Sequence, residues 1–224
     1  MNRFYVVLGL VAVVAGVLIW KSSRSESATA LSSPQGAAVT VTAADSAFHG
    51  YSTGSDSAAV EVVEYADFQC PHCAEFAVVQ FPTIRDQLIL SGRLRWRFRD
   101  FPVGFPWSRL SALAAQCAGE QGKFWEMSDA LFQRQSDWGR STKSPNGLFR
   151  DLARASGADV GKYDACMDSQ RYAGRIEAAH QEGAARNVNG TPTFFVNGRL
   201  HEFPRGATSD GFQALVDSIA GKRQ

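Results

Sequence analysis

The stretch of residues 62–73 reads VVEYADFQCPHC, a β-branched run that leads through a short turn into a Cys-x-x-Cys pair. The run from Ala59 to Tyr65 predicts a buried strand, because β-branched and aromatic residues suit a pleated, covered surface. Apolar residues after the motif recur at roughly helical spacing: Phe76, Val79, Ile84, Leu88 and Leu90. From residue 94 to 99 apolar residues alternate with arginines, as in a half-exposed strand. Strand, helix and strand in this order predict a parallel pair with a right-handed crossover.

The pair Cys70 and Cys73 allows three interpretations: half of a zinc site, a redox-active dithiol, or two unreactive core cysteines. A zinc site usually takes four ligands in two spaced pairs, and the sequence has no second C-x-x-C and no H-x-x-x-H. Cys117 and Cys166 would complete such a site only by coincidence of the fold. We therefore predict no metal site and favour the dithiol, which needs no cofactor.

The local sequence supplies a mechanism for a reactive Cys70. If Pro71 takes the first helical position, where a missing N–H costs nothing, the Cys70 sulfur lies among the free N–H groups of the helix start. Those donors and the helix dipole stabilise a thiolate, the species that attacks disulfides. His72 would add a donor or a positive charge, or would only be a solvated residue. Cys73, one turn further on, would be the less exposed, resolving thiol.

The rest of the globular part alternates between helix signals and one hairpin. Residues 108–187 contain no convincing strand and predict a block of helices, including helices at Asp159–Asp168 and Arg171–Arg186, inserted into the α/β frame. TFFV at 193–196, followed by Asn197-Gly198, predicts a hairpin with a type I′ turn. A last amphipathic helix is expected over Asp210–Ala220.

Three segments together resemble the DsbA-type thiol-disulfide oxidoreductases of the thioredoxin fold: VVEYADFQCPHC, GKFWEMSDALF at 122–132, and NVNGTPTFFVNGR at 187–199. The resemblance covers about residue 57 to the C-terminus. It implies a central mixed sheet flanked by helices, with the helical block as an insertion. It also implies a cis Pro192 facing the dithiol, and a Thr191 that offers backbone groups to an extended substrate segment. If the family resemblance is set aside, Pro192 can be interpreted as an ordinary proline at the start of a strand.

Glu64 lies six residues before Cys70, in an otherwise apolar strand. A carboxylate is costly to bury without a function. The resemblance implies an acidic group beneath the dithiol at this spacing, where it would relay the proton of Cys73. The alternative is that Glu64 faces solvent near the strand end.

The first 57 residues differ in composition from the remainder. Residues 4–20 are an uncharged apolar run that predicts an N-terminal signal anchor over 1–24; the alternatives are a cleaved signal, with Ala28-Thr29-Ala30 as a small-residue site, and a buried core helix. Residues 25–57 are rich in Ser, Ala, Thr and Gly, which predicts a flexible tether, with a short strand at Val39–Val41 as an option. The folded domain is then 58–224.

Either main interpretation of the N-terminus exports the domain. In an exported protein, unpaired Cys117 and Cys166 would be a liability, which favours a structural disulfide worth roughly 4 kcal/mol. The alternative is two small buried hydrophobes on separate helices. The family resemblance points the same way, since some membrane-anchored DsbA-like proteins carry a second cysteine pair in this helical block.

The overall composition narrows the function class. The chain has 224 residues, 45% hydrophobic and 20% charged, which excludes a disordered or collagen-like protein, and its net charge of +1 gives no electrostatic case for nucleic acid. Four arginines alternate with the apolar residues of this strand, over 93–99, and indicate a solvated face, or a surface for an acidic partner or lipid headgroups: Arg93, Arg95, Arg97 and Arg99. His49, His180 and His201 receive no role.

These observations predict an exported, monomeric thiol-disulfide oxidase acting on unfolded client proteins through a mixed disulfide at Cys70. By the family's implication, a membrane protein of DsbB or VKOR type would reoxidise it. An isomerase or reductase of the same fold is the main alternative. A client- or metal-binding module without catalysis is the second.

Overall fold

The computed structural model describes residues 39–204 and 206–221, which form one compact unit around a five-stranded sheet. The strands are β1 (Tyr51–Thr53), β2 (Val60–Ala66), β3 (Leu94–Asp100), β4 (Thr193–Val196) and β5 (Arg199–His201). Their order across the sheet is β1-β3-β2-β4-β5. The sheet is mixed, since β2 and β3 are parallel while every other pair of neighbours is antiparallel. The predicted parallel pair and the mixed sheet of the thioredoxin fold are confirmed.

The helices around the sheet form two groups along the chain, with one further helix before them and one after them. The segment after the Cys-x-x-Cys motif consists of α3 (Pro71–Glu75), η1 (Phe76–Gln80), α4 (Phe81–Ile84) and η2 (Arg85–Ile89). The helical block consists of α5 (Ser108–Gly119), α6 (Phe124–Gln133), α7 (Gln135–Trp138), α8 (Asn146–Ala155), α9 (Val160–Asp168) and α10 (Ala173–Ala185). The short α2 (Ala43–Ala47) precedes the sheet, and α11 (Ser209–Gly221) ends the domain.

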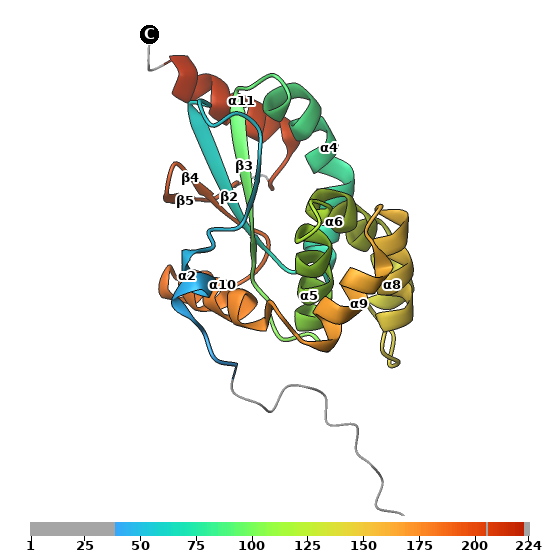
Figure 1. Ribbon diagram of the computed structural model, residues 1–224. Coiled ribbons are helices and arrows are strands. Elements are labelled where there is room, and N and C mark those ends of the chain that lie inside the picture. Colours follow the sequence, from blue (N-terminus) through green and yellow to red (C-terminus); the bar gives the residue numbers. More distant parts are fainter. Residues whose placement is uncertain (1–38, 205, 222–224) are drawn as a thin grey trace, which may run out of the picture. The chain divides into compact units, whose positions relative to one another are not determined.

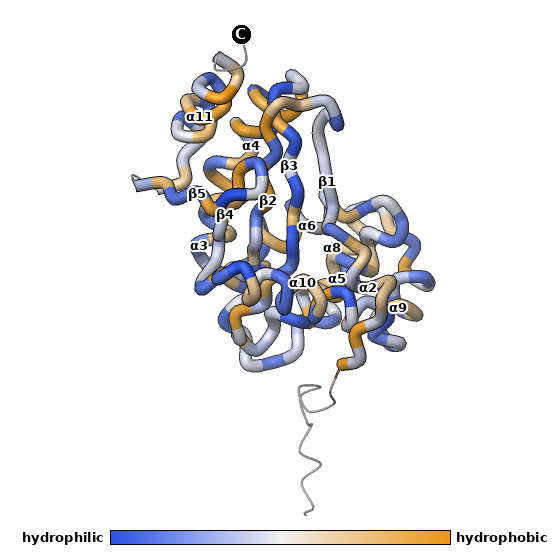
Figure 2. The backbone as a smooth tube through the Cα atoms, turned by 90° about the vertical axis from the view of Figure 1, so that its left-hand side faces the viewer, coloured by the Kyte–Doolittle hydropathy of each residue, from blue (hydrophilic) through white to orange (hydrophobic). Residues whose placement is uncertain are grey.

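Strand β2 is the centre of the molecule. Six of its seven residues are buried, because β3 and β4 flank it and helices cover both faces of the sheet. One face packs against the segment after the motif and against α11, through residues that include Trp96, Phe76 and Phe212. Figure 1 shows α4 and α11 together along one end of the sheet, and Figure 2 shows apolar stretches on both helices. The opposite face carries Tyr65 and Phe195, which pack with Phe101.

The helical block forms its own apolar core beside the sheet. This core is continuous with the motif, because Cys70 and Cys73 belong to the same buried cluster as Phe124, Met127 and Cys117. Figure 1 shows α5, α6, α8 and α9 grouped beyond the end of β2, with α10 and α2 on another side of the sheet. No strand lies between residues 108 and 187, as predicted.

The predicted hairpin and last helix are also confirmed. Asn197 and Gly198 both have positive φ, 46° and 81°, as a type I′ turn requires, and β4 pairs antiparallel with β5. Glycine adopts such angles without strain, and asparagine tolerates them better than most residues.

The helix after the motif differs from the expected apolar face. Phe76, Ile84 and Leu88 are buried, whereas Val79 and Leu90 are 60% and 74% exposed. The segment contains two π-helical turns, and each shifts the residues that follow it around the helix axis relative to a regular 3.6-residue repeat. A uniform helical period therefore assigns Val79 and Leu90 to the wrong face.

The predicted tether is wrong for its last part. Helix α2 and strand β1 lie within residues 25–57, and β1 pairs antiparallel with β3. Tyr51 stacks on Phe124 with ring centroids 3.8 Å apart. A Cβ at Gly119 would lie 2.2 Å from the Tyr51 hydroxyl, so this glycine leaves room for the ring. The stacking of Tyr51 and the hydrogen bonds between β1 and β3 hold this segment on the domain. A low content of large apolar residues does not reveal either contact. No strand forms over 39–41.

The arginines of residues 93–99 form no free basic surface: the side chains of Arg93, Arg95 and Arg97 stay partly exposed, at 36%, 28% and 21%, but are ion-paired. Arg93 pairs with Asp217, Arg97 with Glu61 at 2.6 Å, and Arg95 with Asp56 and Glu61 at 3.2 and 3.8 Å. Arg99 is only 3% exposed and pairs with Glu182 of α10. Carboxylates from sequence-distant elements thus neutralise the stripe, and this correction follows from tertiary contacts alone.

The predicted signal anchor at 1–24 and the first part of the tether lie outside the described residues. Across the described ranges, no helix combines the length and the apolar character needed to cross a bilayer.

Candidate active site

The motif occupies the turn between the end of β2 and the start of α3. Cys70 is the N-cap residue in extended backbone geometry, and Pro71 is the first residue of the helix. A proline is favoured there because its missing N–H would be unpaired in any case. The Cys70 N–H donates to the Asp67 carbonyl at 3.0 Å, and the Cys70 carbonyl accepts from Ala74 at 3.1 Å. The predicted helix start at the dithiol is confirmed.

The environment of Cys70 stabilises its thiolate. Hydrogen bonding from the Cys73 thiol is the largest influence, and with smaller contributions from Thr191 and from the backbone N–H groups of Cys73 and His72 it lowers the Cys70 pKa to about 5 despite burial. In the thiol form the Cys70 S–H donates to the Thr191 carbonyl, 3.4 Å away. The Thr191 hydroxyl is buried with no hydrogen-bond partner among the described residues. Cys70 is therefore the more acidic thiol of the pair.

Cys73 has the opposite environment. It is completely buried, and burial, the hydrogen bond to Cys70, the Cys70 charge and the Glu64 charge raise its pKa well above the usual value. Two thiols three residues apart thus differ strongly in acidity. This asymmetry suits one attacking sulfur and one sulfur that holds its proton until it has to react.

Glu64 is buried in β2, 4% exposed, and does not face solvent. Trp96 of β3 donates to its Oε2 from Nε1 at 3.1 Å, while Oε1 has no partner among the described residues. Burial raises the Glu64 pKa to about 8, against a smaller opposing effect of the Trp96 hydrogen bond. The carboxyl group lies near enough to Cys73 to influence its pKa.

Thr191 and Pro192 approach the dithiol from the start of β4. The peptide bond between them is cis. Strand β4 lies beside β2 with Tyr65 opposite Thr193, so the sheet register brings residues 191–192 next to the motif, about 120 positions earlier in the chain. The cis bond implied by the family resemblance is present.

His72 faces outward. Its side chain is 81% exposed, with Nδ1 3.9 Å from Glu75 Oε2. Its contribution to the acidity of Cys70 comes from its backbone N–H. A tuning role for the imidazole stays a prediction.

Asp67 is a site residue that the sequence analysis missed. Its carboxylate is 2% exposed and accepts hydrogen bonds from Gln69 N at 2.8 Å, Val103 N at 2.8 Å and Ser108 Oγ at 2.6 Å. It therefore ties the turn before Cys70 to the loop after β3 and to the start of α5. Burial raises its pKa, and the Cys70 charge adds to the effect. The available signal in the sequence was an acidic residue three positions before Cys70.

Two buried or half-buried glutamines continue this support. Gln69 accepts from Trp107 N at 2.6 Å and donates to the Gly139 carbonyl at 2.8 Å. Gln135 donates to the carbonyls of Phe68 and Cys70 at 2.7 and 2.9 Å. Hydrogen bonds between the helical block and the turn before α3 thus hold the backbone of Cys70 in place.

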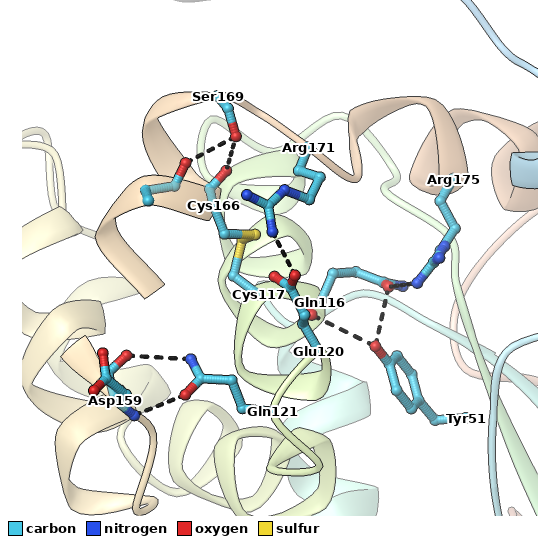
Figure 3. Close-up of a disulfide and its surroundings, with 11 residues drawn as sticks. Tyr51, Gln116, Cys117, Glu120, Gln121, Asp159, Cys166, Ser169, Arg171 and Arg175 are labelled. Carbon is cyan, nitrogen blue, oxygen red and sulfur yellow. Dashed lines mark hydrogen bonds and ion pairs between the residues drawn. A yellow bond between two sulfur atoms is a disulfide. The ribbon is translucent and has the colours of Figure 1, made fainter. Parts of the chain in front are cut away.

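Cys117 of α5 and Cys166 of α9 form a disulfide with Cα atoms 5.7 Å apart, as predicted. Figure 3 shows it between the two helices. On the same turn of α5, Gln116 accepts from Tyr51 and Arg175, and Glu120 pairs with Arg171. The bond therefore joins two helices of the block and is separate from the dithiol. Across 39–204 and 206–221, no group of three or more His, Cys, Asp or Glu side chains is placed to hold a metal ion.

A family model described as thioredoxin matches residues 47–218. The chain belongs to the thioredoxin family. Disulfide bond formation protein D of Bacillus subtilis is 30% identical over 152 residues, which are 66% of this chain and 67% of that protein. The crystal structure of oxidised BdbD from the same organism superimposes with a TM-score of 0.68 at 27% identity, covering 76% of this chain and 92% of that one. Reduced DsbA of Mycobacterium tuberculosis gives a TM-score of 0.64 at 26% identity, covering 78% and 93%.

The resemblance to DsbA-type proteins is thus confirmed, and the relatives and structural neighbours of this chain include protein-disulfide oxidoreductases. Other relatives are much longer. Sodium/proton antiporter NhaA 3 of Salinispora tropica is 37% identical over 153 residues, which are 67% of this chain and only 22% of that protein. The chain therefore spans about a fifth of the length of its antiporter relatives.

Proposed function

We propose that the chain is an exported thiol-disulfide oxidoreductase that introduces disulfides into client proteins through Cys70 and Cys73. The observation that carries this proposal is the divergent acidity of the two thiols, with the Cys70 pKa lowered to about 5 and that of Cys73 raised. An environment that stabilises the Cys70 thiolate stabilises the reduced protein. The disulfide is then a strong oxidant, because its reduction is favourable.

The reaction proceeds in two thiol-disulfide exchanges. A client thiolate attacks the Cys70 sulfur, the Cys70–Cys73 bond breaks, and Cys73 leaves as a thiolate that takes up a proton. A second client thiolate then attacks the client sulfur of the mixed disulfide, and Cys70 leaves as a stabilised thiolate. Two electrons pass from the client to the protein, and the client gains one disulfide.

Glu64 would supply the proton for Cys73. It is buried near Cys73, and a pKa of about 8 leaves it largely protonated at neutral pH. On reoxidation, when Cys73 must attack, the same carboxylate would take the proton back. Thr191 and Pro192 would bind the client, since their backbone lies beside Cys70.

Two features support an extracytoplasmic location. The Cys117–Cys166 disulfide is typical of oxidising compartments. The apolar run at 4–20 would act as an anchor that holds the domain near a membrane reoxidant of DsbB or VKOR type.

The test uses oxidised protein and a reduced, unfolded client. For each client disulfide that wild type forms, the client should lose two thiols and the protein should gain two, at Cys70 and Cys73. Cys70→Ala should be inactive, and activity in this variant refutes the mechanism. Equilibration with glutathione determines the direction, because a potential near about −120 mV indicates an oxidase and one near about −270 mV a reductase. Client binding that survives loss of both cysteines, without turnover in wild type, would identify a binding module instead.

A further inference from the structure

Thr191 reaches the dithiol from the loop between α10 and β4, residues 186–192. Its carbonyl oxygen lies 3.4 Å from Cys70 Sγ, so the position of this α10–β4 loop decides which backbone groups face the reactive sulfur. At the end of the loop, the Gly190 carbonyl accepts a hydrogen bond from Thr193 Oγ1 at 2.7 Å. This bond shapes the loop, but it does not fix the loop to the strand that leads to the motif.

Tyr65 of β2 makes that connection at both ends of the loop. Its backbone lies opposite Thr193 in the antiparallel pair of β2 and β4, which sets where the loop ends. Its hydroxyl accepts a hydrogen bond from Arg186 Nη1 at 3.1 Å, which sets where the loop begins. Tyr65 is completely buried and precedes Cys70 by five positions, so one rigidly packed residue relates the loop to the motif.

Charged neighbours hold the Tyr65 hydroxyl in place. It donates to Glu182 Oε1 of α10 at 2.8 Å, so it acts as donor and acceptor at once. Glu182 is also paired with Arg99, the buried arginine of β3. Arg186 lies over the Phe195 ring of β4, with Cζ 3.8 Å from the centroid. The hydroxyl therefore lies between two side chains at the C-terminal end of α10, and each of them also contacts the sheet.

We propose that the Tyr65 hydroxyl positions the α10–β4 loop, and with it the Thr191 backbone, for thiol-disulfide exchange between Cys70 and peptide thiols. This inference rests on the proposed function and adds a positioning residue to it. The hydroxyl acts through Arg186, the first residue of the loop. Without it, the loop keeps its register at Thr193, but its first residue can shift. The net contribution of one hydrogen bond corresponds to a factor of roughly 2 to 10 in an equilibrium constant, which sets the scale of the effect.

The test replaces Tyr65 by phenylalanine, which removes only the hydroxyl and leaves the ion pair of Glu182 with Arg186, at 3.8 Å. Oxidised protein is mixed with a dithiol peptide, which has a backbone for the loop to bind, or with dithiothreitol, which has none. In both reactions two thiols of the reagent become a disulfide and the active-site disulfide is reduced. The peptide-to-dithiothreitol ratio of rates should fall roughly 2- to 10-fold in Tyr65→Phe.

Tyr163→Phe is the matched control. Tyr163 of α9 is 2% exposed, and its hydroxyl has no hydrogen-bond partner among the described residues. The variant makes the same chemical change in the helical block and should keep the wild-type ratio. Arg186→Gln removes the other partner of the bond. Because both variants break one interaction, Tyr65→Phe/Arg186→Gln should have the same ratio as Arg186→Gln alone.

An unchanged ratio in Tyr65→Phe overturns the proposal, and so does an equal loss in Tyr163→Phe. An equal slowing of both reactions in Tyr65→Phe also overturns it, because a general loosening of the site would affect dithiothreitol as well.

Amide exchange examines the loop without a redox reaction. The Val188 N–H donates to the Gly183 carbonyl at 3.0 Å, and its exchange should be faster in Tyr65→Phe than in wild type. This measurement separates the two proposals. A wild type that dithiothreitol reduces but the peptide does not would refute the proposed function, whereas unchanged exchange at Val188 would refute the positioning role.

Discussion

Replacing Cys73 by alanine tests the origin of the reactivity of Cys70. The Cys73 thiol is buried beneath Cys70 and makes the largest contribution to its pKa of about 5. Alanine removes this donor but keeps the backbone N–H at position 73, so the helix start stays intact. We therefore expect the Cys70 pKa to rise without loss of the fold.

The size of the rise follows from the strength of the lost bond. A hydrogen bond to a charged group contributes about 1.5–3 kcal/mol, and one pKa unit corresponds to about 1.4 kcal/mol. The pKa of Cys70 should thus increase by roughly 1–2 units, to about 6–7. At pH 6 the thiolate fraction would fall from about nine-tenths to one-half or less.

The assay is a titration of the thiolate absorbance near 240 nm, with the Cys70→Ala variant as the background. Cys73→Ser keeps a hydrogen-bond donor in the same place and serves as the matched variant, with a midpoint between those of wild type and Cys73→Ala. A midpoint near 5 in Cys73→Ala would refute the reasoning, because the helix N-terminus and Thr191 alone would then account for the acidity.

Three further outcomes are expected. In the oxidised protein, Glu64→Gln should remove a fall in stability between about pH 5 and 8 that urea unfolding detects in wild type: burial raises the Glu64 pKa to about 8, so the folded state binds a proton that the unfolded state releases. Asp67→Asn should cost about 1–3 kcal/mol and speed amide exchange at Val103, since an amide cannot accept all three hydrogen bonds; unchanged exchange would contradict the assigned support. Cys117→Ala/Cys166→Ala should lower the free energy of unfolding by about 4 kcal/mol, as a 49-residue loop predicts, and leave the thiolate titration of Cys70 unaltered.

Local patterns predict much of this fold because they reflect local physics. The Asn197-Gly198 turn and the Pro71 helix start each follow from backbone geometry within a few residues, and each is present. The period-two alternation predicted for 94–99 holds as far as Phe98, whereas Arg99 is buried. The predicted Cys117–Cys166 disulfide is also present. Its prediction did not need the positions of the two helices, because it started from the argument that unpaired cysteines are a liability in an exported protein. Boundaries that depend on long-range packing were missed, as the docking of Tyr51 on Phe124 illustrates.

The candidate site shows the same division. Spacing and residue type identified the dithiol, while the roles given to Glu64 and Thr191 required a family resemblance. Asp67 was missed because its partners Val103 and Ser108 lie on other elements. The arginines of β3 were misjudged because their carboxylates lie up to 124 positions away in the sequence.

The sequence by itself determined the chemistry of the protein: two cysteines at a strand-to-helix turn, with a proline that starts the helix. The tertiary structure decided how far the two thiols diverge in acidity, since burial, together with the Cys70 and Glu64 charges, raises the pKa of Cys73. It also decided that Glu64 is buried and that carboxylates of other elements pair with the arginines of residues 93–99. Acidity depends on distance and burial, which residues far apart in a chain acquire only when it folds.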